Sequence, residues 1–438
     1  MTRRAAPRLP ALVDELELTG PWPPVEDLAR HEVVYLLLRL GGEPVGRLHL
    51  ESPGITLGQG GLPAAIESSL AGAPLERFRS LRARREDPAA PGEGADQPGR
   101  DAAAVEPDHP FATVVVPTRN RPGDLDNCLS SLARQRYRGF EVIVVDSAGA
   151  PGVAQGVVDR WSGRIETRII REENPGLSLA RNRGLAMARG EFVAFLDDDC
   201  RADAAWLGAI ASALGLTGCG AVTGPMLPAE LGTRAQRLFL RYTYMDRRGF
   251  DRVVFGPRGE AGHDGIVRLP SKVWPVDSWR IGGGGNMALR RVLIPRVGGF
   301  DESLGAGTPA HGGEDLMILH KLVDADQSVC FEPRAVVWHR HWREMGQLRG
   351  LLFRHGAGHT AYVLACWRER LHRQRLVRYE AGFLLNRVSR LGASLVGARR
   401  YDPSLPLCEL AGSLGGIVLA GRSRMRARRP GIPGEMER

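Results

Sequence analysis

Three consecutive carboxylates, Asp197, Asp198 and Asp199, directly follow the apolar run Phe192–Leu196. Alternate residues of an extended chain point to the same side, about 6.5–7 Å apart, so we expect Asp197 and Asp199 to face one site while Asp198 faces away. Mg²⁺ and Mn²⁺ take one or two protein carboxylates and fill their other positions with water and phosphate oxygens. The triplet therefore predicts a divalent-metal site or, alternatively, a helix cap formed by Asp199 or Asp203.

A second acidic pair, Glu314 and Asp315, follows two glycines and precedes the apolar run at 316–323, which has helical spacing. A carboxylate in this position is suited to removing a proton from a substrate hydroxyl. It is equally suited to complementing the positive end of a helix dipole. The two glycines favour the first interpretation because they leave room beside the pair.

Two histidines, His339 and His341, lie two residues apart after the strand-like segment 335–337. At that spacing both side chains face the same side of an extended chain. Neutral imidazole is a good Mn²⁺ ligand. A structural role in the core is the alternative for each of them.

The elements that position these residues alternate between strand and helix. We expect strands over 111–116, 140–145, 166–170 and 192–196, and helices over 125–137, 153–161 and 179–188. This order is typical of an open α/β sheet with right-handed crossovers, in which ligands bind beyond the carboxyl ends of the strands. The ends of three strands present Thr118, Asp146 and Asp197 to Asp199, which predicts one polar rim.

The motifs along the chain resemble those of the family 2 glycosyltransferases, which have the GT-A fold. The resemblance covers roughly residues 111–343 and is carried by the ordered set Val-Val-Pro-Thr-Arg-Asn, Val-Ile-Val-Val-Asp, Gly-Leu-Ser-Leu-Ala-Arg-Asn-Arg-Gly and Phe-Leu-Asp-Asp-Asp. Gly-Gly-Gly-Asn-Met-Ala-Leu, Gly-Gly-Phe-Asp-Glu, Gly-Glu-Asp and Val-Val-Trp-His follow in the family's order. It implies an α/β catalytic domain built on an open mixed sheet flanked by helices.

The resemblance also implies a role for each candidate residue on the donor side. The first strand end and the aspartate after the second strand hold the nucleotide base and ribose in this family, and the acidic motif holds the metal. Arg181 and Asn182 would lie close to the diphosphate or the metal-binding acids, or would pack their helix on the sheet. The residues expected to bind the nucleotide sugar are Pro117, Thr118, Arg119, Asp146, Arg181, Asn182, Asp197 and Asp198, and those expected to bind Mg²⁺ or Mn²⁺ are Asp197, Asp199 and His339.

On the acceptor side, the family precedent makes Asp315 the base and leaves Glu314 to orient the acceptor. The implied reaction is an inverting, metal-assisted transfer from a UDP-, GDP- or dTDP-linked sugar to a glycan, lipid-linked or small-molecule acceptor. Two departures from the pattern affect specificity: Ser147 replaces the usual acid after Asp146, and Met317 stands where many relatives have a further acid.

Two other functions fit parts of the sequence. A sugar-phosphate nucleotidyltransferase also binds nucleotide and metal, but such enzymes start with a Gly-rich loop bearing Arg and Lys, which 117–120 is not. A non-catalytic carbohydrate- or nucleotide-binding protein is the third possibility. Nucleic acid is disfavoured as a partner because the central rim is acidic and the arginines are not interleaved with aromatic residues.

Composition excludes some classes of protein. The net charge of +9 is carried by arginine, and the two lysines, Lys272 and Lys321, follow no glycine loop, which excludes a Walker-type phosphate site. Six cysteines without paired spacing and no secretory signal favour free thiols in a reducing cytoplasm. No uncharged apolar run reaches the roughly 18 residues needed to span a bilayer.

Four segments are expected along the chain: a small module at 1–83 with a β-hairpin, a linker at 84–109, the catalytic domain at 110–343, and an Arg-rich helical extension at 344–438. A long stretch between Pro225 and Trp279, which includes Arg237, Arg241, Tyr242, Tyr244 and Trp274, is expected to form an acceptor-side loop or lid. The C-terminal helices, expected over 345–353, 360–375, 379–399 and 407–424, either pack on the catalytic domain or lie on an anionic membrane surface. The predicted location is cytoplasmic, with the second alternative placing the protein at the inner face of the membrane.

Overall fold

A computed structural model of the chain describes residues 9–57, 61–86, 110–243, 249–256, 267–270, 281–369, 371, 373–397 and 402–427. These residues form two compact units. The first comprises the N-terminal segment together with 228–250 and 340–344, and the second comprises 109–227, 251–339 and 345–438. Most of the predicted linker, residues 87–109, lies outside the described part of the chain.

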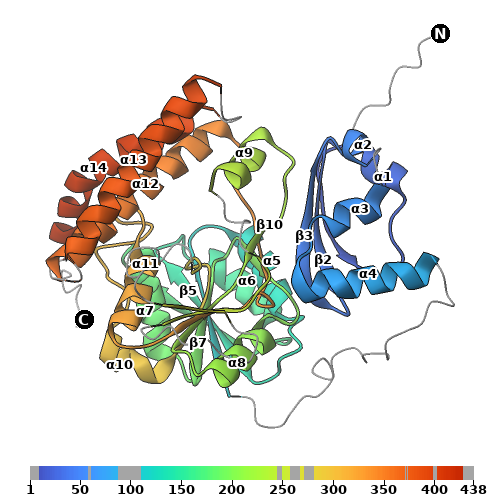
Figure 1. The fold of residues 1–438 in the computed structure, drawn as a ribbon. Coiled ribbons are helices and arrows are strands. Elements are labelled where there is room, and N and C mark those ends of the chain that lie inside the picture. The colour runs from blue at the N-terminus through green and yellow to red at the C-terminus, as the bar shows by residue number, and fades with distance from the viewer. Residues whose placement is uncertain are drawn as a thin grey trace. The chain divides into compact units, whose positions relative to one another are not determined.

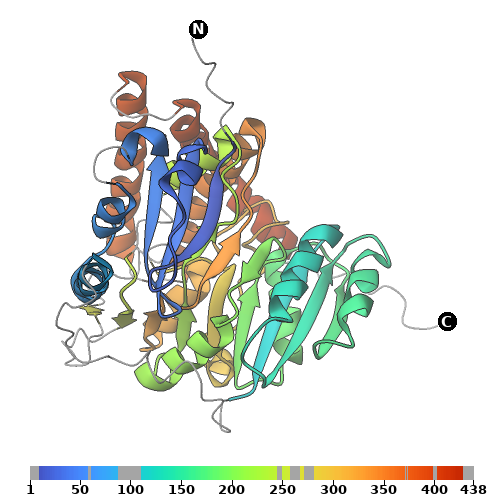
Figure 2. The ribbon, with the colours of Figure 1, turned by 90° about the vertical axis from the view of Figure 1, so that its right-hand side faces the viewer.

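The first unit is built on a three-stranded sheet, drawn in blue in Figures 1 and 2, in the order β1-β2-β3. The predicted hairpin is present, because Gly41 and Gly42 adopt left-handed backbone angles of +64° and +84° between β2 and β3. Alternate residues of β2 face α3 and α4, where Leu36 and Leu38 join the core. The elements are β1 (Leu12–Glu17), α1 (Val25–Ala29), β2 (Val33–Leu40), β3 (Glu43–Glu51), α2 (Pro53–Thr56), α3 (Gly61–Glu67) and α4 (Gly72–Glu86).

Part of the predicted acceptor-side loop belongs to this first unit. Helix α9 (Arg234–Thr243) is paired with the N-terminal segment through Arg237 and Glu32, whose Nη2 and Oε2 atoms are 2.6 Å apart, and through Arg241 and Glu51. His341 is buried against Phe239 of α9, so its side chain packs within the first unit. The module therefore extends beyond the predicted 1–83. Of the other residues named for the loop, Tyr242 is buried, and Tyr244 and Trp274 lie outside the described residues.

The second unit contains a nine-stranded mixed sheet in the order β12-β11-β14-β9-β13-β7-β4-β5-β6. Strands β7, β4, β5 and β6 are parallel neighbours, whereas β13 runs antiparallel to both β7 and β9. The predicted open mixed sheet flanked by helices is confirmed. The strands are β4 (Ala112–Thr118), β5 (Phe140–Ser147), β6 (Thr167–Glu172), β7 (Phe192–Leu196), β9 (Ala221–Thr223), β11 (Val253–Gly256), β12 (Val267–Pro270), β13 (Asn286–Arg290) and β14 (Val329–Phe331).

Helices cover both faces of this sheet, with α7, α10 and α11 on one side and α5, α6 and α8 on the other (Figure 1). Strands buried on both faces consist of nearly continuous apolar residues, as the parallel strands here do. On the first face Val115, Ile143 and Phe195 pack against Ala180 and Ile318. The helices are α5 (Pro122–Leu132), α6 (Val153–Trp161), α7 (Leu177–Met187), α8 (Trp206–Thr217), α10 (Ile294–Val297), preceded by the 3₁₀ turn η4 (Arg291–Leu293), and α11 (Glu314–Asp324).

A small second sheet of β10 (Met226–Pro228), β15 (Val337–His339) and β8 (Cys200–Ala202) crosses the end of β7. Strand β15 is antiparallel to β8, and His339 pairs with Cys200 in their register. This pairing brings a residue far along the chain to the position immediately after Asp199.

Three long helices follow: α12 (Met345–Arg368), α13 (Arg373–Leu395) and α14 (Ser404–Ala427). The prediction of separate helices over 345–353 and 360–375 is wrong, because α12 runs without a break through the first and ends at Arg368 within the second. Gly356 and Gly358 lie where the predicted helices were separated, and both are points of close contact. An added Cβ would overlap the Glu409 carbonyl oxygen at Gly356 and the Gly312 backbone at Gly358. Glycine is used here for close backbone approach.

Close packing of α14 on α12 leads to a stability prediction. A Cβ at Gly412 would overlap the carbonyl oxygen of Phe353, whereas a Cβ at Gly421 of the same helix meets nothing within 4 Å. Gly412→Ala should therefore lower the free energy of unfolding by about 1–3 kcal/mol through overpacking. Gly421→Ala should raise it by up to about 1 kcal/mol through helix propensity. Urea unfolding of both variants measures the difference, and equal shifts of the same sign would contradict the packing argument.

Candidate active site

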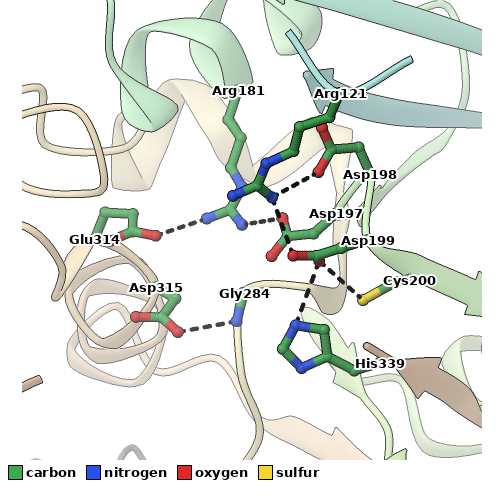
Figure 3. Close-up of polar contacts among 10 residues, drawn as sticks. All are labelled: Arg121, Arg181, Asp197, Asp198, Asp199, Cys200, Gly284, Glu314, Asp315 and His339. Carbon is green, nitrogen blue, oxygen red and sulfur yellow. Dashed lines mark hydrogen bonds and ion pairs between the residues drawn. The ribbon is translucent and has the colours of Figure 1, made fainter. Parts of the chain in front are cut away.

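Asp197, Asp198 and Asp199 follow β7 and point in different directions (Figure 3). Asp197 and Asp199 are partly exposed, whereas Asp198 is 5% exposed and accepts hydrogen bonds from Thr118 Oγ1 at 2.7 Å and Arg121 Nη1 at 3.2 Å. Burial, and then the neighbouring Asp199 charge, raises the pKa of Asp198 to about 7. Asp198 thus links the ends of β4 and β7. Asp199 does not cap α8; in the loop before that helix, Asp203 accepts a hydrogen bond from the backbone N–H of Ala205.

Arg121 is a residue at the acidic cluster that the sequence motifs did not single out. Its Nη1 atom lies 3.2 Å from Asp198 and 3.1 Å from Asp199, while Arg119, the arginine predicted for the nucleotide, is exposed on the loop. The motif Arg-Asn-Arg offered two arginines, and only the residue at the start of α5 reaches the acids. Residues two apart point the same way along an extended chain, so no signal in the sequence separates these two arginines.

Asp199, Cys200 and His339 form a candidate cation site. One ligand atom from each lies within 4.8 Å of the others, and His339 Nε2 is 3.3 Å from Asp199 Oδ1. Burial lowers the pKa of His339, but the Asp199 charge outweighs it and the net pKa is raised. Burial, followed by Asp199, raises the pKa of the Cys200 thiol, so the thiol stays protonated at neutral pH. A carboxylate and an imidazole are the donors that fit Mn²⁺ or Mg²⁺ here.

Arg181 links the acidic triplet to the second acidic pair, as Figure 3 shows. Its guanidinium is 1% exposed and donates from Nη2 to Asp197 Oδ1 and from Nη1 to Glu314 Oε1, both at 2.9 Å. The Phe300 ring lies beneath it at 5.4 Å. A buried guanidinium needs such paired carboxylates, because losing one partner leaves an uncompensated charge. Arg181 therefore fixes Asp197 and Glu314 relative to each other.

Glu314 and Asp315 begin α11 at Gly313, whose φ is +92°. Glu314 is buried, whereas Asp315 is partly exposed and accepts a hydrogen bond from the backbone N–H of Gly284 at 2.9 Å. Burial, and then the Asp315 charge, raises the pKa of Glu314, although Arg181 opposes this. Glu314 is thus enclosed by the protein, and Asp315 is the member of the pair open to a substrate.

The remaining predicted residues divide between the rim and the core. Asp146, at the end of β5, is 6% exposed and accepts from Arg171 Nη1 at 2.9 Å and from the Gly149 N–H at 3.0 Å. Pro117, also a predicted nucleotide contact, is buried at the end of β4. Asn182 instead holds the loop before Glu302: its side chain donates to the Phe300 carbonyl and accepts from the Phe300 N–H. Of the two interpretations of Asn182, the contacts fit helix packing.

The raised pKa of Glu314 makes stability depend on pH. Between its ordinary value of 4.5 and the raised value, the folded chain holds a proton that the unfolded chain has lost, so the free energy of unfolding falls as pH rises through this window. In Glu314→Gln, the fall in the free energy of unfolding over this pH window should be smaller by at least about 1.4 kcal/mol, the equivalent of one pKa unit. Urea unfolding without metal at about pH 5 and about pH 8 measures it. Glu302→Gln, at an exposed site, is the control, and an unchanged slope in Glu314→Gln would contradict the assignment.

Comparison with known proteins identified a family model and related sequences that match part of this chain. The model of the family described as glycosyl transferase family 2 matches residues 113–265. A pre-mycofactocin glycosyltransferase of Mycobacterium tuberculosis is 28% identical over 240 residues, which are 54% of this chain and 44% of the relative. Glycosyltransferase AglE of Haloferax volcanii is 24% identical over 253 residues, 57% of this chain and 73% of the relative. The match thus spans less than half the length of the first relative.

Solved structures give a weaker likeness over a longer stretch. The mannosyltransferase PcManGT of Pyrobaculum calidifontis, determined in complex with GDP-Man and Mn²⁺, has a TM-score of 0.47 and 20% identity. The likeness covers 84% of this chain and 98% of that protein.

Proposed function

Since the chain carries a glycosyl transferase family 2 domain, we propose that it is an inverting glycosyltransferase that transfers a sugar from a nucleotide-diphosphate-sugar donor to an acceptor hydroxyl. The observation that carries this proposal is the meeting of two acidic groups from distant parts of the chain. Asp197 to Asp199 end β7, Glu314 and Asp315 begin α11, and the buried Arg181 holds the two groups together.

On the donor side, the ends of β4 and β5 are assigned to the nucleotide. Thr118 and Asp146 lie at these two neighbouring strand ends, where open α/β sheets bind ligands. A carboxylate binds the N–H edge of a base or the ribose hydroxyls through charge-assisted hydrogen bonds. Asp199 and His339, with Asp197 beside them, are assigned to the divalent cation. When bound, such a cation neutralises the charge that grows on the departing diphosphate.

On the acceptor side, Asp315 is assigned as the base. It accepts the proton of the acceptor hydroxyl while that oxygen forms its bond to the anomeric carbon and the bond from this carbon to the diphosphate oxygen breaks. The nucleoside diphosphate leaves on the opposite face, which inverts the configuration. Glu314 is enclosed and paired with Arg181, so its proposed role is to keep Asp315 and its helix in position.

A nucleotide-binding screen tests the proposal. Thermal unfolding of the protein is followed with UDP, GDP and dTDP, each with and without Mn²⁺. The expected result is a rise in Tm with one nucleotide that requires Mn²⁺, because the diphosphate and the acidic motif share the cation. The matching nucleotide sugar should then release its nucleotide in the presence of an acceptor. A Tm rise with nucleoside triphosphates alone, together with pyrophosphate release from a sugar phosphate, would instead support the nucleotidyltransferase alternative.

A further inference from the structure

Helix α13 presents a stripe of large apolar side chains to the outside, although Leu376 at its start is buried, and several of its charged side chains lie on the inside. Its inward stripe includes Glu380, Arg387 and Arg390; Arg390 is 7% exposed, and the Arg387 side chain is 17% exposed. Glu380 Oε2 lies 2.9 Å from His359 Nε2 of α12. Arg387 Nε lies 2.7 Å from Glu409 Oε2 of α14. The charges of this helix are therefore largely used within the bundle.

The outward stripe of α13 repeats at helical spacing and carries no acidic residue. Helix α14 presents a similar stripe and has no charged residue between Leu410 and Gly421. We call the large apolar side chains of the two stripes, all at least 55% exposed, the outer face: Val377, Leu385, Val388, Leu395, Leu407, Leu414, Ile417, Val418 and Met425. An exposed apolar surface of this kind on two helices that pack against each other marks an interaction site.

This arrangement reverses what water favours. A helix on the surface of a soluble protein faces the core with its apolar stripe and solvent with its charges. Lipid favours the opposite, with ionisable groups paired inside the bundle and apolar side chains outside. Close contact of small residues supports the same environment: Gly412 and Gly416 of α14, four residues apart, pack on the backbone of α12 at Phe353 and Ala357.

The charges around the outer face indicate which lipid. The exposed charged residues on the described parts of α13 and α14 are arginines, namely Arg378, Arg422 and Arg426, of which Arg426 also donates to the Gly307 carbonyl. The acids of these helices are engaged: Glu380 and Glu409 make the two ion pairs described above. A cationic border attracts anionic headgroups. A second copy of the chain would bring the same cationic border against itself in a two-fold contact, which like charges disfavour.

Helix α14 is long enough to cross a membrane, but its contacts with the rest of the protein favour an orientation along the membrane surface. Among the described residues, only α14 meets the length and hydropathy needed for a span, and at 24 residues it is about 36 Å long. Its inner side is occupied along its length, since Ser413 bonds Thr360 of α12, Ser423 bonds Ser303, and Arg426 donates to the Gly307 carbonyl. One side of α14 is thus covered by protein.

From these observations we infer that the outer face of α13 and α14 docks in the interfacial layer of an anionic lipid bilayer. The apolar stripes enter the acyl boundary, and the bordering arginines contact the headgroup phosphates. The inference does not depend on the proposed reaction, because it concerns helices outside the acidic site.

Vesicle flotation of the full chain tests it, with phosphatidylcholine vesicles and with vesicles that also contain phosphatidylglycerol. The wild type should float with the anionic vesicles. Leu385→Glu combined with Leu414→Glu should reduce binding about tenfold or more, because two leucines that the bound state buries in the lipid are lost. The matched control is Leu216→Glu combined with Val292→Glu: Leu216 is 67% exposed, close to the 69% and 68% of Leu385 and Leu414, and it lies on α8. The control should float like the wild type.

A second pair of substitutions separates the headgroup contribution. Arg378→Gln with Arg422→Gln should weaken binding to the anionic vesicles by at least about fivefold and leave binding to phosphatidylcholine unchanged. A wild type that stays unbound to both vesicles would overturn the inference, as would equal flotation of the Leu385→Glu, Leu414→Glu variant. A wild-type dimer in solution that this variant converts to a monomer, without flotation, would show that a second copy covers the outer face.

Discussion

Replacing Asp199 with asparagine is expected to reduce kcat/KM by about 10²–10³-fold or more, the loss seen when a group that stabilises transition-state charge is removed. The substitution keeps the shape of the side chain but removes the negative charge that lies 3.3 Å from His339 Nε2 and 3.1 Å from Arg121 Nη1. The proposed cation would lose its principal oxygen donor. The Mn²⁺-dependent rise in Tm with nucleotide should disappear together with activity.

Asp203→Asn is the matched control for this substitution. Asp203 lies four residues along the chain and bonds the backbone N–H of Ala205 at 2.9 Å, so its change leaves the acidic cluster intact. The control should keep near-wild-type kcat/KM and the metal-dependent shift. Turnover of Asp199→Asn within about threefold of the wild type would rule out the role assigned to Asp199.

Replacing Asp315 with asparagine is expected to lower kcat by about 10²–10⁴-fold, the usual contribution of general base catalysis. The carboxamide oxygen still accepts the Gly284 N–H that Asp315 holds at 2.9 Å, so the fold and nucleotide binding should be unchanged. This separates Asp315 from Asp199: metal-dependent nucleotide binding survives in one variant and is lost in the other.

Asp324→Asn, at the opposite end of α11, is the control for helix effects, since Asp324 is exposed and far along the helix. It should leave kcat unchanged. Two results would contradict the assignment of Asp315 as base: a kcat within about tenfold of the wild type, or an equal loss of nucleotide binding and turnover.

The short ordered motifs were enough to predict the open mixed sheet that the structure shows and the glycosyl transferase family 2 domain whose model matches residues 113–265. The reason is physical: parallel strands buried on both faces have to be nearly continuous apolar runs, and their polar residues then collect at the strand ends. Strand β4 and helix α6 were located to within two residues by this pattern. The assignments of Asp315, Asp199 and His339 remain proposals, supported by their positions on converging elements.

Other features depended on tertiary contacts that no local pattern carries. The break predicted within α12 falls at Gly356 and Gly358, where glycine allows close approach of neighbouring backbones. Arg121 and Arg119 are chemically identical, and only the turn into α5 decides which one reaches the acids. The amphipathic pattern of α13 was visible in the sequence, but Arg387 and Arg390 turn inward, whereas basicity suggested an arginine surface.

The ion pairs of Arg181 have a consequence for how the family could diversify. The buried Arg181 side chain sets the distance between Asp197 and Glu314. It therefore also sets the distance between the proposed donor and acceptor sides of the site. Under the proposed function, loops on the acceptor side can then change without altering that spacing. A new acceptor specificity would then require changes only outside the residues that Arg181 holds together.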